Sequence, residues 1–264
     1  MKLGFIGCGN MATAMIRGII KNNIVKAEEI IGSNSTKKNA TRTKEALGIV
    51  TTTDNKEVVR NADFIFLGVK PQIYEPVLQE IKGELDEKQV IISIAPGKTI
   101  QWFEEQLSES TKIVRTMPNT PACVGEGMTG VCCNTQVTPE ELEAVSGFLR
   151  GFGRMEMVPE GQMDVVSAVS GSSPAYVYMF IEAMADAAVA EGMARDKAYQ
   201  FAAQAVLGSA KMVMETGKHP GALKDEVCSP SGSTIQGVRV LEKKGMRSAV
   251  FEALEACINQ TKNM

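Results

Sequence analysis

A glycine-rich turn near the start of the chain has the spacing of a dinucleotide-binding site. An apolar run ends there in Gly7-x-Gly9-x-x-Ala12. The first glycine of such a turn permits a tight bend out of a strand, the second lets the backbone approach a pyrophosphate, and the alanine keeps the next helix close. The start of that helix offers N–H groups to the phosphates. Because the turn opens a pattern of alternating strands and helices, we favour a dinucleotide site over a turn that serves packing alone.

The residues after the next predicted strand indicate which dinucleotide binds. Glu28 and Glu29 precede the apolar residues of that strand, at the end away from the ligand, so neither can hold the adenosine ribose. The ligand end carries hydroxyl, amide and cationic groups, which would bind a 2′-phosphate that a carboxylate would repel. They predict NADPH as the cofactor and NADH as a weaker substitute, with a solvated basic helix face as the alternative. These residues are Ser33, Asn34, Ser35, Lys37, Lys38 and Arg42.

Two more predicted strands run into prolines at the same edge of the sheet. Gly68 to Gln72 reads GVKPQ, and Ser93 to Thr99 reads SIAPGKT. Ligands of open α/β sheets bind at this edge, so both loops are expected to line the cofactor. Ordinary turn prolines are the alternative, but Lys70 is hard to explain in that way because it follows a fully apolar strand.

Few side chains could donate a proton to a second substrate. The single histidine, His219, lies in the turn-like sequence KHPG, where a surface or capping role is expected. This scarcity suits an electrophile that is already cationic, such as a protonated imine, because that substrate needs orientation more than it needs an acid.

Two serine-rich runs are candidates for orienting such a substrate. SGSSPAY, from Ser170 to Tyr176, and CSPSGSTIQG, from Cys228 to Gly237, each place hydroxyl groups and a glycine before a predicted helix. The start of a helix can bind a carboxylate, although either run could be a simple N-cap. Two such runs in an alanine-rich region favour a role in binding.

The elements that must position these residues are of two kinds. Residues 1–160 alternate short β-branched runs with helical patterns, which indicates an α/β fold with a Rossmann-type, doubly wound, mostly parallel sheet. Over residues 161–264, alanine and methionine recur at helical spacing and predict an all-helical domain. Its segment YQFAAQAVLGSAKMVMETG is apolar on more than one face, which favours a buried or intersubunit position. The predicted strands are Lys2–Ile6, Glu29–Gly32, Ile49–Thr52, Phe64–Val69, Val90–Ala95, Lys112–Met117, Gly130–Cys133 and Arg154–Val158.

Composition excludes several other classes of protein. Apolar residues make up 44% and charged residues 22%, and the net charge is −3, so no basic field would attract nucleic acid or a membrane surface. The six cysteines show no metal-binding spacing, and we expect no metal. No apolar run reaches membrane-spanning length or looks like a signal peptide. These features predict a cytoplasmic protein with reduced cysteines.

Several of these motifs together resemble the pyrroline-5-carboxylate reductase family, and the resemblance runs the length of the chain. It rests on FIGCGNMA, GVKP, RTMPNTPA (Arg115 to Ala122), SGSSPAY and HPGALKDEVCSPSGSTIQG. GxGxxA alone would fit many enzymes, whereas the last segment is the most specific of the five. Their order and spacing together leave little room for another family.

The resemblance implies the reaction and the assembly. The reaction is the NAD(P)H-dependent reduction of the cyclic imine 1-pyrroline-5-carboxylate to L-proline, the last step of proline biosynthesis, by hydride transfer to the imine carbon and without a metal. The helical domain would form a homodimer, which often assembles into larger rings such as decamers. The substrate would lie between the nicotinamide and the Ser231–Thr234 loop, which in this family comes from the second subunit, with Thr234 as the catalytic residue near the imine nitrogen.

The resemblance also assigns roles to single residues. The substrate-binding residues would be Ser172, Ser231, Gly232, Ser233 and Thr234. The pyrophosphate would contact Gly7, Gly9, Asn10 and Met11, the adenosine and its phosphate would contact Ser33, Asn34 and Asn55, and the nicotinamide half would contact Val69, Lys70 and Ala95. Lys37 and Pro71, which adjoin these segments, complete the predicted cofactor site.

One position departs from the family pattern, and two other interpretations stay open. The family commonly has Gly-Gly where this chain has Ser231-Gly232, which adds a side chain beside the substrate loop. A Rossmann reductase of another imine or of a keto acid would depend on a catalytic lysine, such as Lys197 or Lys211, or on acidic metal ligands. A non-catalytic sensor would bind the dinucleotide without turnover.

Overall fold

The computed structural model describes residues 2–262 and divides the chain into two compact units. The first unit comprises the residues up to Ser172 and again those from Ile258 onward, and the second is Ser173–Cys257. This division follows the contacts of the backbone. The boundary that the sequence predicts between residues 160 and 161 stays a prediction.

The first unit is built on an eight-stranded sheet in the order β3-β2-β1-β4-β5-β6-β7-β8. Neighbouring strands are parallel except for the pair β6 and β7. All eight predicted strands are present, so the doubly wound, mostly parallel sheet is confirmed. The strands are β1 (Leu3–Ile6), β2 (Ile30–Ser33), β3 (Val50–Thr52), β4 (Phe64–Leu67), β5 (Val90–Ser93), β6 (Lys112–Met117), β7 (Gly127–Cys133) and β8 (Gly153–Met157).

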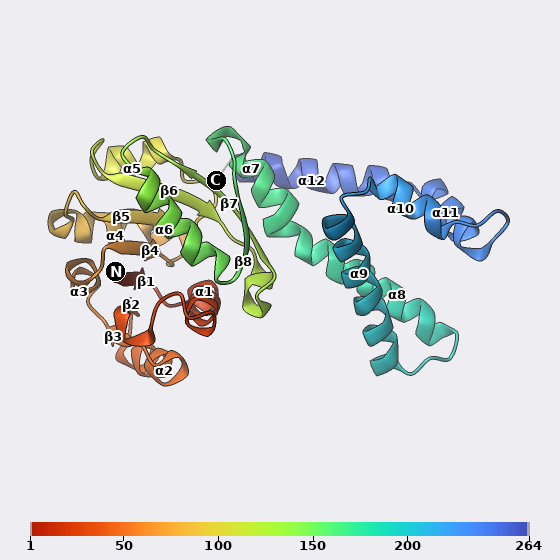
Figure 1. Cartoon of the computed structure of the whole chain (residues 1–264), viewed down its shortest axis with the longest axis horizontal. Coiled ribbons are helices and arrows are strands. Elements are labelled where there is room, and N and C mark those ends of the chain that lie inside the picture. Colours follow the sequence, from red (N-terminus) through yellow and green to blue (C-terminus); the bar gives the residue numbers. More distant parts are fainter. Residues whose placement is uncertain (1, 263–264) are drawn as a thin grey trace. The chain divides into compact units, whose positions relative to one another are not determined.

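Helices pack on both faces of this sheet, as Figure 1 shows. One face buries apolar side chains of α1 (Asn10–Lys21), α2 (Lys37–Leu47) and α6 (Pro139–Arg150) against alternate residues of the strands. The other face buries those of α3 (Asn55–Asn61), α4 (Tyr74–Ile81) and α5 (Ile100–Gln106). Strands that are buried on both sides explain the nearly continuous apolar runs in the sequence.

The strand order reverses beside β1, and this reversal creates the ligand edge. The chain passes from β1 to β2 and β3 on one side and then crosses to β4 on the other. The loops that follow β1 and β4 therefore meet outside the carboxyl ends of their strands, where open α/β sheets bind ligands. Here the amide of Gly68 donates to the carbonyl of Ile6 at 2.7 Å.

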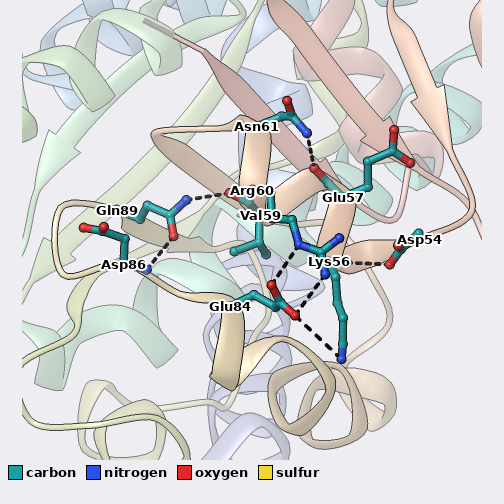
Figure 2. A network of polar contacts seen from close by, with 9 residues as sticks. All are labelled: Asp54, Lys56, Glu57, Val59, Arg60, Asn61, Glu84, Asp86 and Gln89. Carbon is teal, nitrogen blue, oxygen red and sulfur yellow. Dashed lines mark hydrogen bonds and ion pairs between the residues drawn. The ribbon is translucent and has the colours of Figure 1, made fainter.

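A polar network holds α3 in place at this sheet (Figure 2). The guanidinium of Arg60 donates to both carboxylate oxygens of Glu84, at 2.8 and 3.0 Å, and this pairing lowers the pKa of Glu84. At the end of the helix, the Gln89 amide donates to the carbonyls of Val59, at 2.6 Å, and of Ala62, at 2.7 Å, and so ties down the C-terminal end of α3. The network thereby fixes the helix that begins with Asn55, a predicted cofactor residue.

The second unit consists of helices only. α8 (Ser173–Ala190) and α9 (Arg195–Thr216) pack against each other, and α10 (Pro220–Val227), α11 (Ser233–Lys243) and the part of α12 (Met246–Lys262) up to Cys257 follow. Of its described residues, only the small side chains of Ala185, Ala198 and Ala202 are buried. Most of its large apolar side chains are therefore exposed in the single chain.

The helix that contains SGSSPAY does not begin where the sequence predicts. α7 (Met163–Val166) continues through a π-helical segment, Ser167–Ser172, directly into α8, so the predicted helix start before Pro174 is wrong. Proline has no N–H to donate to the carbonyl four residues earlier, that of Ser170. The side-chain amide of Asn119 donates to that carbonyl instead, at 3.0 Å.

Candidate active site

A cavity of about 950 Å³ opens at the edge where the loops after β1 and β4 meet. Its walls are these two loops, the loops after β2 and β3, and one face each of α1 and α2. The cavity lies wholly within the first unit. Eight of the predicted cofactor residues line it: Gly7, Gly9, Asn10, Ser33, Asn34, Asn55, Val69 and Lys70.

Four other predicted cofactor residues are not among the residues that line this cavity. Met11 packs against the core beneath α1, and Ala95 is buried in the core on the other face of the sheet. Lys37 is exposed at the start of α2, and Pro71 lies half-buried beyond Lys70. Their contacts with a cofactor stay predictions.

Gly7 and Gly9 are glycines for different physical reasons. Gly7 has φ +90°, and a Cβ at that position would lie 2.5 Å from Cγ1 of Val69, so both the backbone and the packing require glycine. Gly9 has φ −79°, and a Cβ there would meet no protein atom closer than the carbonyl oxygen of Gly68, at 3.9 Å. The fold tolerates a side chain at position 9, whereas a ligand close to the backbone would not. The turn therefore fits a dinucleotide.

Ser33 connects the glycine turn to α3. Its side chain is 1% exposed, and its hydroxyl donates to Oδ1 of Asn55 at 2.7 Å and accepts from the amide of Gly7 at 3.3 Å. Next to it, Oδ1 of Asn34 is buried and has no hydrogen-bond partner, which is rare for a buried polar atom. This oxygen lies in a side chain that lines the cavity, where a ligand hydroxyl group would satisfy it.

The charge of the cavity is positive. Arg17, Arg42 and Lys70 line it, and none of its described lining residues is acidic. Lys38, like Lys37, is exposed but does not line the cavity. An acid-free cationic wall favours a ligand with several phosphates.

Helix faces supply several lining residues that reasoning from the sequence did not name. Thr13 and Arg17 follow Asn10 along α1, and Asn39 precedes Arg42 on α2. Residues three or four apart share one face of a helix, so this spacing from Asn10 was the available signal. Cys123 also lines the cavity, but it comes from a distant turn that no local pattern connects to the site.

The buried thiol in the glycine turn has no chemical role that the structure supports. Cys8 is 8% exposed, and burial raises its pKa to about 12. A thiol with so high a pKa is a poor nucleophile, since the thiolate is the reactive form. Cys8 therefore acts as a small apolar side chain of the core.

The loop before α11 has the helix start that the sequence predicts. α11 begins at Ser233, with Gly232 as its N-cap and no side chain that caps it. A Cβ on Gly232 would lie 2.4 Å from Oγ of Ser229 and 3.2 Å from its carbonyl oxygen, so a side chain there would require the Ser229 hydroxyl to move. Ser231 has φ +59°, a conformation that favours glycine. Ser231, the residue at which this chain departs from the family pattern, therefore has a strained backbone conformation.

His219 and the metal prediction can also be compared with the structure. The Nδ1 atom of His219 accepts from the amide of Gly221 at 3.0 Å and caps α10, as expected. Over residues 2–262, no group of three or more His, Cys, Asp and Glu side chains is placed to bind a metal. No helix in the same range is both long and apolar enough to cross a membrane.

Comparison with known proteins identifies the family. A family model described as pyrroline-5-carboxylate reductase dimerisation matches residues 160–264, and one described as NADP oxidoreductase, coenzyme F420-dependent, matches residues 2–97. The pyrroline-5-carboxylate reductase of Escherichia coli K12 is 49% identical over 263 residues, which cover 100% of this chain and 98% of that protein. The chain belongs to the pyrroline-5-carboxylate reductase family. The resemblance seen in its motifs is thereby confirmed, and residues 160–264 form the dimerisation region through which this family member makes a homodimer.

Solved structures of the family agree with this assignment. The pyrroline carboxylate reductase of Plasmodium falciparum, solved with NADP bound, superposes with a TM-score of 0.91 at 36% identity, over 100% of this chain and 97% of that one. The enzyme of Coxiella burnetii gives a TM-score of 0.92 at 35% identity, over 99% and 97% of the two chains. The α/β domain followed by helices is thus the fold of the family.

Proposed function

We propose that this chain reduces 1-pyrroline-5-carboxylate to L-proline with NADPH, by hydride transfer to the imine carbon. Its relatives are named for this activity, and the homologue from Plasmodium falciparum holds NADP. The observation in this chain that carries the proposal is the acid-free, cationic cavity beside Gly9, a glycine that neither backbone nor packing requires.

Different groups of cofactor residues bind different parts of the NADPH molecule. The amides at the start of α1, after Gly9, bind the pyrophosphate. Asn34, Asn55 and Arg42 hold the adenosine end, where the guanidinium pairs with the 2′-phosphate, and Val69 with Lys70 borders the nicotinamide half. Within the proposal, the twelve cofactor residues predicted from the sequence keep their roles, and Arg17 with Asn39 joins them.

The substrate needs orientation and charge compensation. NADPH supplies the hydride. The N–H groups at the start of α11 hold the substrate carboxylate, and Thr234, in the first turn of that helix, lies near the imine nitrogen. Ser172, Ser231, Gly232 and Ser233 complete the substrate site in this proposal. His219 caps a helix with its Nδ1, which supports a mechanism that does not use it as an acid.

The assembly and location form part of the same proposal. Beyond the homodimer, we propose a larger ring such as a decamer, because large apolar side chains cover several helices of the second unit. A cytoplasmic location is proposed because all six cysteines are free thiols. The domain boundary is proposed at residues 160 and 161, where the dimerisation match begins.

The first experiment follows the oxidation of NADPH, and separately of NADH, with racemic 1-pyrroline-5-carboxylate as the only acceptor. We expect turnover with both cofactors and a higher kcat/KM with NADPH. Equal or faster turnover with NADH would keep the reaction and reject the 2′-phosphate site. NADPH binding without turnover would indicate a sensor or a reductase of another imine or keto acid.

The variant Thr234→Ala tests the proposed catalytic residue. Loss of one polar contact made in the transition state lowers kcat by about 10²-fold, with NADPH affinity nearly unchanged. Steady-state kinetics and fluorescence titration with NADPH measure the two quantities. Ser209→Ala on α9 is the control, because its hydroxyl donates only to the carbonyl of Ala205 within its own helix. A Thr234→Ala enzyme with full turnover would remove Thr234 from the mechanism.

A further inference from the structure

Among the described residues of the first unit, one tyrosine is buried in the core, and it lies directly behind two cofactor loops. Tyr74 is the first residue of α4 and is 0% exposed, between the sheet and α5. Its neighbour Ile73 lines the cofactor cavity, whereas the Tyr74 ring packs edge-on against Phe103, at 5.9 Å between ring centroids. A phenylalanine would fill the same apolar space, so packing alone does not require the hydroxyl group.

The hydroxyl of Tyr74 bridges two neighbouring strands at the point where their pairing ends. It donates to the carbonyl of Leu67, the last residue of β4, at 2.5 Å. It also accepts from the amide of Ile94, the first residue beyond β5, at 3.4 Å. The register of β4 and β5 ends at the pair Leu67 and Ser93, so this hydroxyl makes the next cross-link after the ladder.

Both segments that follow this bridge belong to the proposed cofactor site. Gly68, Val69 and Lys70 come directly after Leu67 and line the cavity. Ala95 comes directly after Ile94 and is assigned to the nicotinamide half in the proposed function. Burial raises the pKa of Tyr74 to about 12, so its hydroxyl keeps the proton that it donates to Leu67 even in alkaline solution.

We propose that Tyr74 is a positioning residue for the nicotinamide: its hydroxyl fixes the spacing of the loops after β4 and β5, and thereby the place of the reacting ring. It touches neither cofactor nor substrate. In the proposed function the adenosine end is held by Asn34, Asn55 and Arg42, which lie outside the two loops that the bridge joins. The inference rests on the proposed function for the identity of the ring that the loops border.

The variant Tyr74→Phe removes the bridge and keeps the ring. Three quantities are measured: the melting temperature, the Kd values of NADPH and of 2′-phospho-ADP-ribose, which lacks the nicotinamide, and kcat with 1-pyrroline-5-carboxylate. We expect the fragment to bind within about twofold of wild type, NADPH to bind about threefold more weakly, and kcat to fall about tenfold, because small displacements of reacting groups are costly. A purely structural role would weaken both ligands equally or neither, and either result would overturn the proposal.

Phe103→Leu is the matched control. It perturbs the same core cluster and the same ring contact, but it removes no hydrogen bond to Leu67 or Ile94. We expect a lower melting temperature with an unchanged ratio of the two Kd values; a changed ratio would attribute the effect to general loosening and overturn the proposal. If wild type binds NADPH but does not turn over, the proposed function fails, while the ratio of Kd values still tests the role of Tyr74.

Discussion

The two units of this chain bury their apolar side chains to very different degrees. In the first unit, Phe5, Phe66 and Phe152 are all 0% exposed. In the second unit, Phe201 is 67% and Phe251 is 73% exposed. The first unit therefore has a complete core within one chain, whereas the second exposes side chains that a stable fold would bury.

The two units thus depend on different partners. The match of residues 160–264 to a dimerisation family explains the exposed apolar surface of the helices, because a second subunit would cover it. The sheet unit instead leaves a polar and cationic cavity open, which suits a small ligand. Substitutions in one unit should therefore affect dimerisation, and substitutions in the other should affect cofactor binding.

The largest effect is expected from a charge on the exposed apolar surface of α9. Phe201→Glu would bury an unpaired carboxylate in the dimer, which weakens association by about 3–5 kcal/mol. Analytical ultracentrifugation should show monomers that still bind NADPH, because the cavity lies in the other unit. Lys44→Glu, an exposed change on α2, is the control and should leave the dimer intact. A stable Phe201→Glu dimer would show that this surface is not the interface.

Gly7→Ala is expected to destabilise the first unit, which contains the sheet. The left-handed backbone and the 2.5 Å approach to Val69 together should lower the free energy of unfolding by about 3 kcal/mol. Urea denaturation measures this loss. Wild-type stability in this variant would contradict the account of the glycine turn.

Gly9→Ala is the counterpart that should leave the fold unchanged. Its Cβ would meet no protein atom closer than 3.9 Å but would enter the space of a pyrophosphate, so NADPH should bind at least about tenfold more weakly while the melting temperature stays the same. Calorimetric titration with NADPH and a thermal scan test the two halves of this prediction. Unchanged affinity would mean that the dinucleotide does not approach this backbone.

Smaller effects, on the preference for NADPH over NADH, are expected from Arg42 and from the two lysines at the start of α2. Arg42→Ala should raise KM for NADPH about tenfold and leave KM for NADH nearly unchanged, because a charge-assisted contact to the 2′-phosphate is lost. The double variant Lys37→Ala, Lys38→Ala should show the same preference to a smaller degree, since neither lysine lines the cavity. Equal losses with both cofactors in either variant would refute a phosphate role for the residues concerned.

The smallest effect is expected in the helical unit. Ser231→Gly should raise the free energy of unfolding by about 1 kcal/mol, because glycine adopts a φ of +59° without strain. Thermal unfolding of the dimer measures this gain. Ser229→Gly, at the other end of the same turn, is a control without such a benefit. A less stable Ser231→Gly enzyme would mean that the serine hydroxyl makes a compensating contact.

Most of the fold was predictable because its signals are local. The strands are apolar on both faces, so β-branched runs such as that of β5 stand out, and turn residues separate them. The helical run that continues from α7 into α8 was not predictable, because the sequence at Pro174 is typical of the beginning of a new helix. The structure places Pro174 inside a continuous helical run, where Asn119, more than fifty residues away, donates to the carbonyl that proline cannot reach with an N–H.

The candidate site was predictable where the loops follow strands, as at Gly7, Ser33 and Lys70. It was less predictable on helices, because chain order does not say which face of α2 turns toward the cavity. Arg42 is on that face, and Lys37 and Lys38 are not among its residues. The hydroxyl bridge of Tyr74 was beyond any local pattern, since it depends on the ends of two strands that meet only in the folded sheet.

The open space beside Gly9 has a consequence for how this sequence can change over generations. A mutation to alanine there would yield protein that folds, dimerises and escapes degradation, so quality control in the cell would not remove it. Natural selection would remove such a variant only because it binds the cofactor poorly. A lineage that no longer needed the reaction would therefore be expected to lose Gly9 early and to keep Gly7 for as long as the chain is still made as a folded protein.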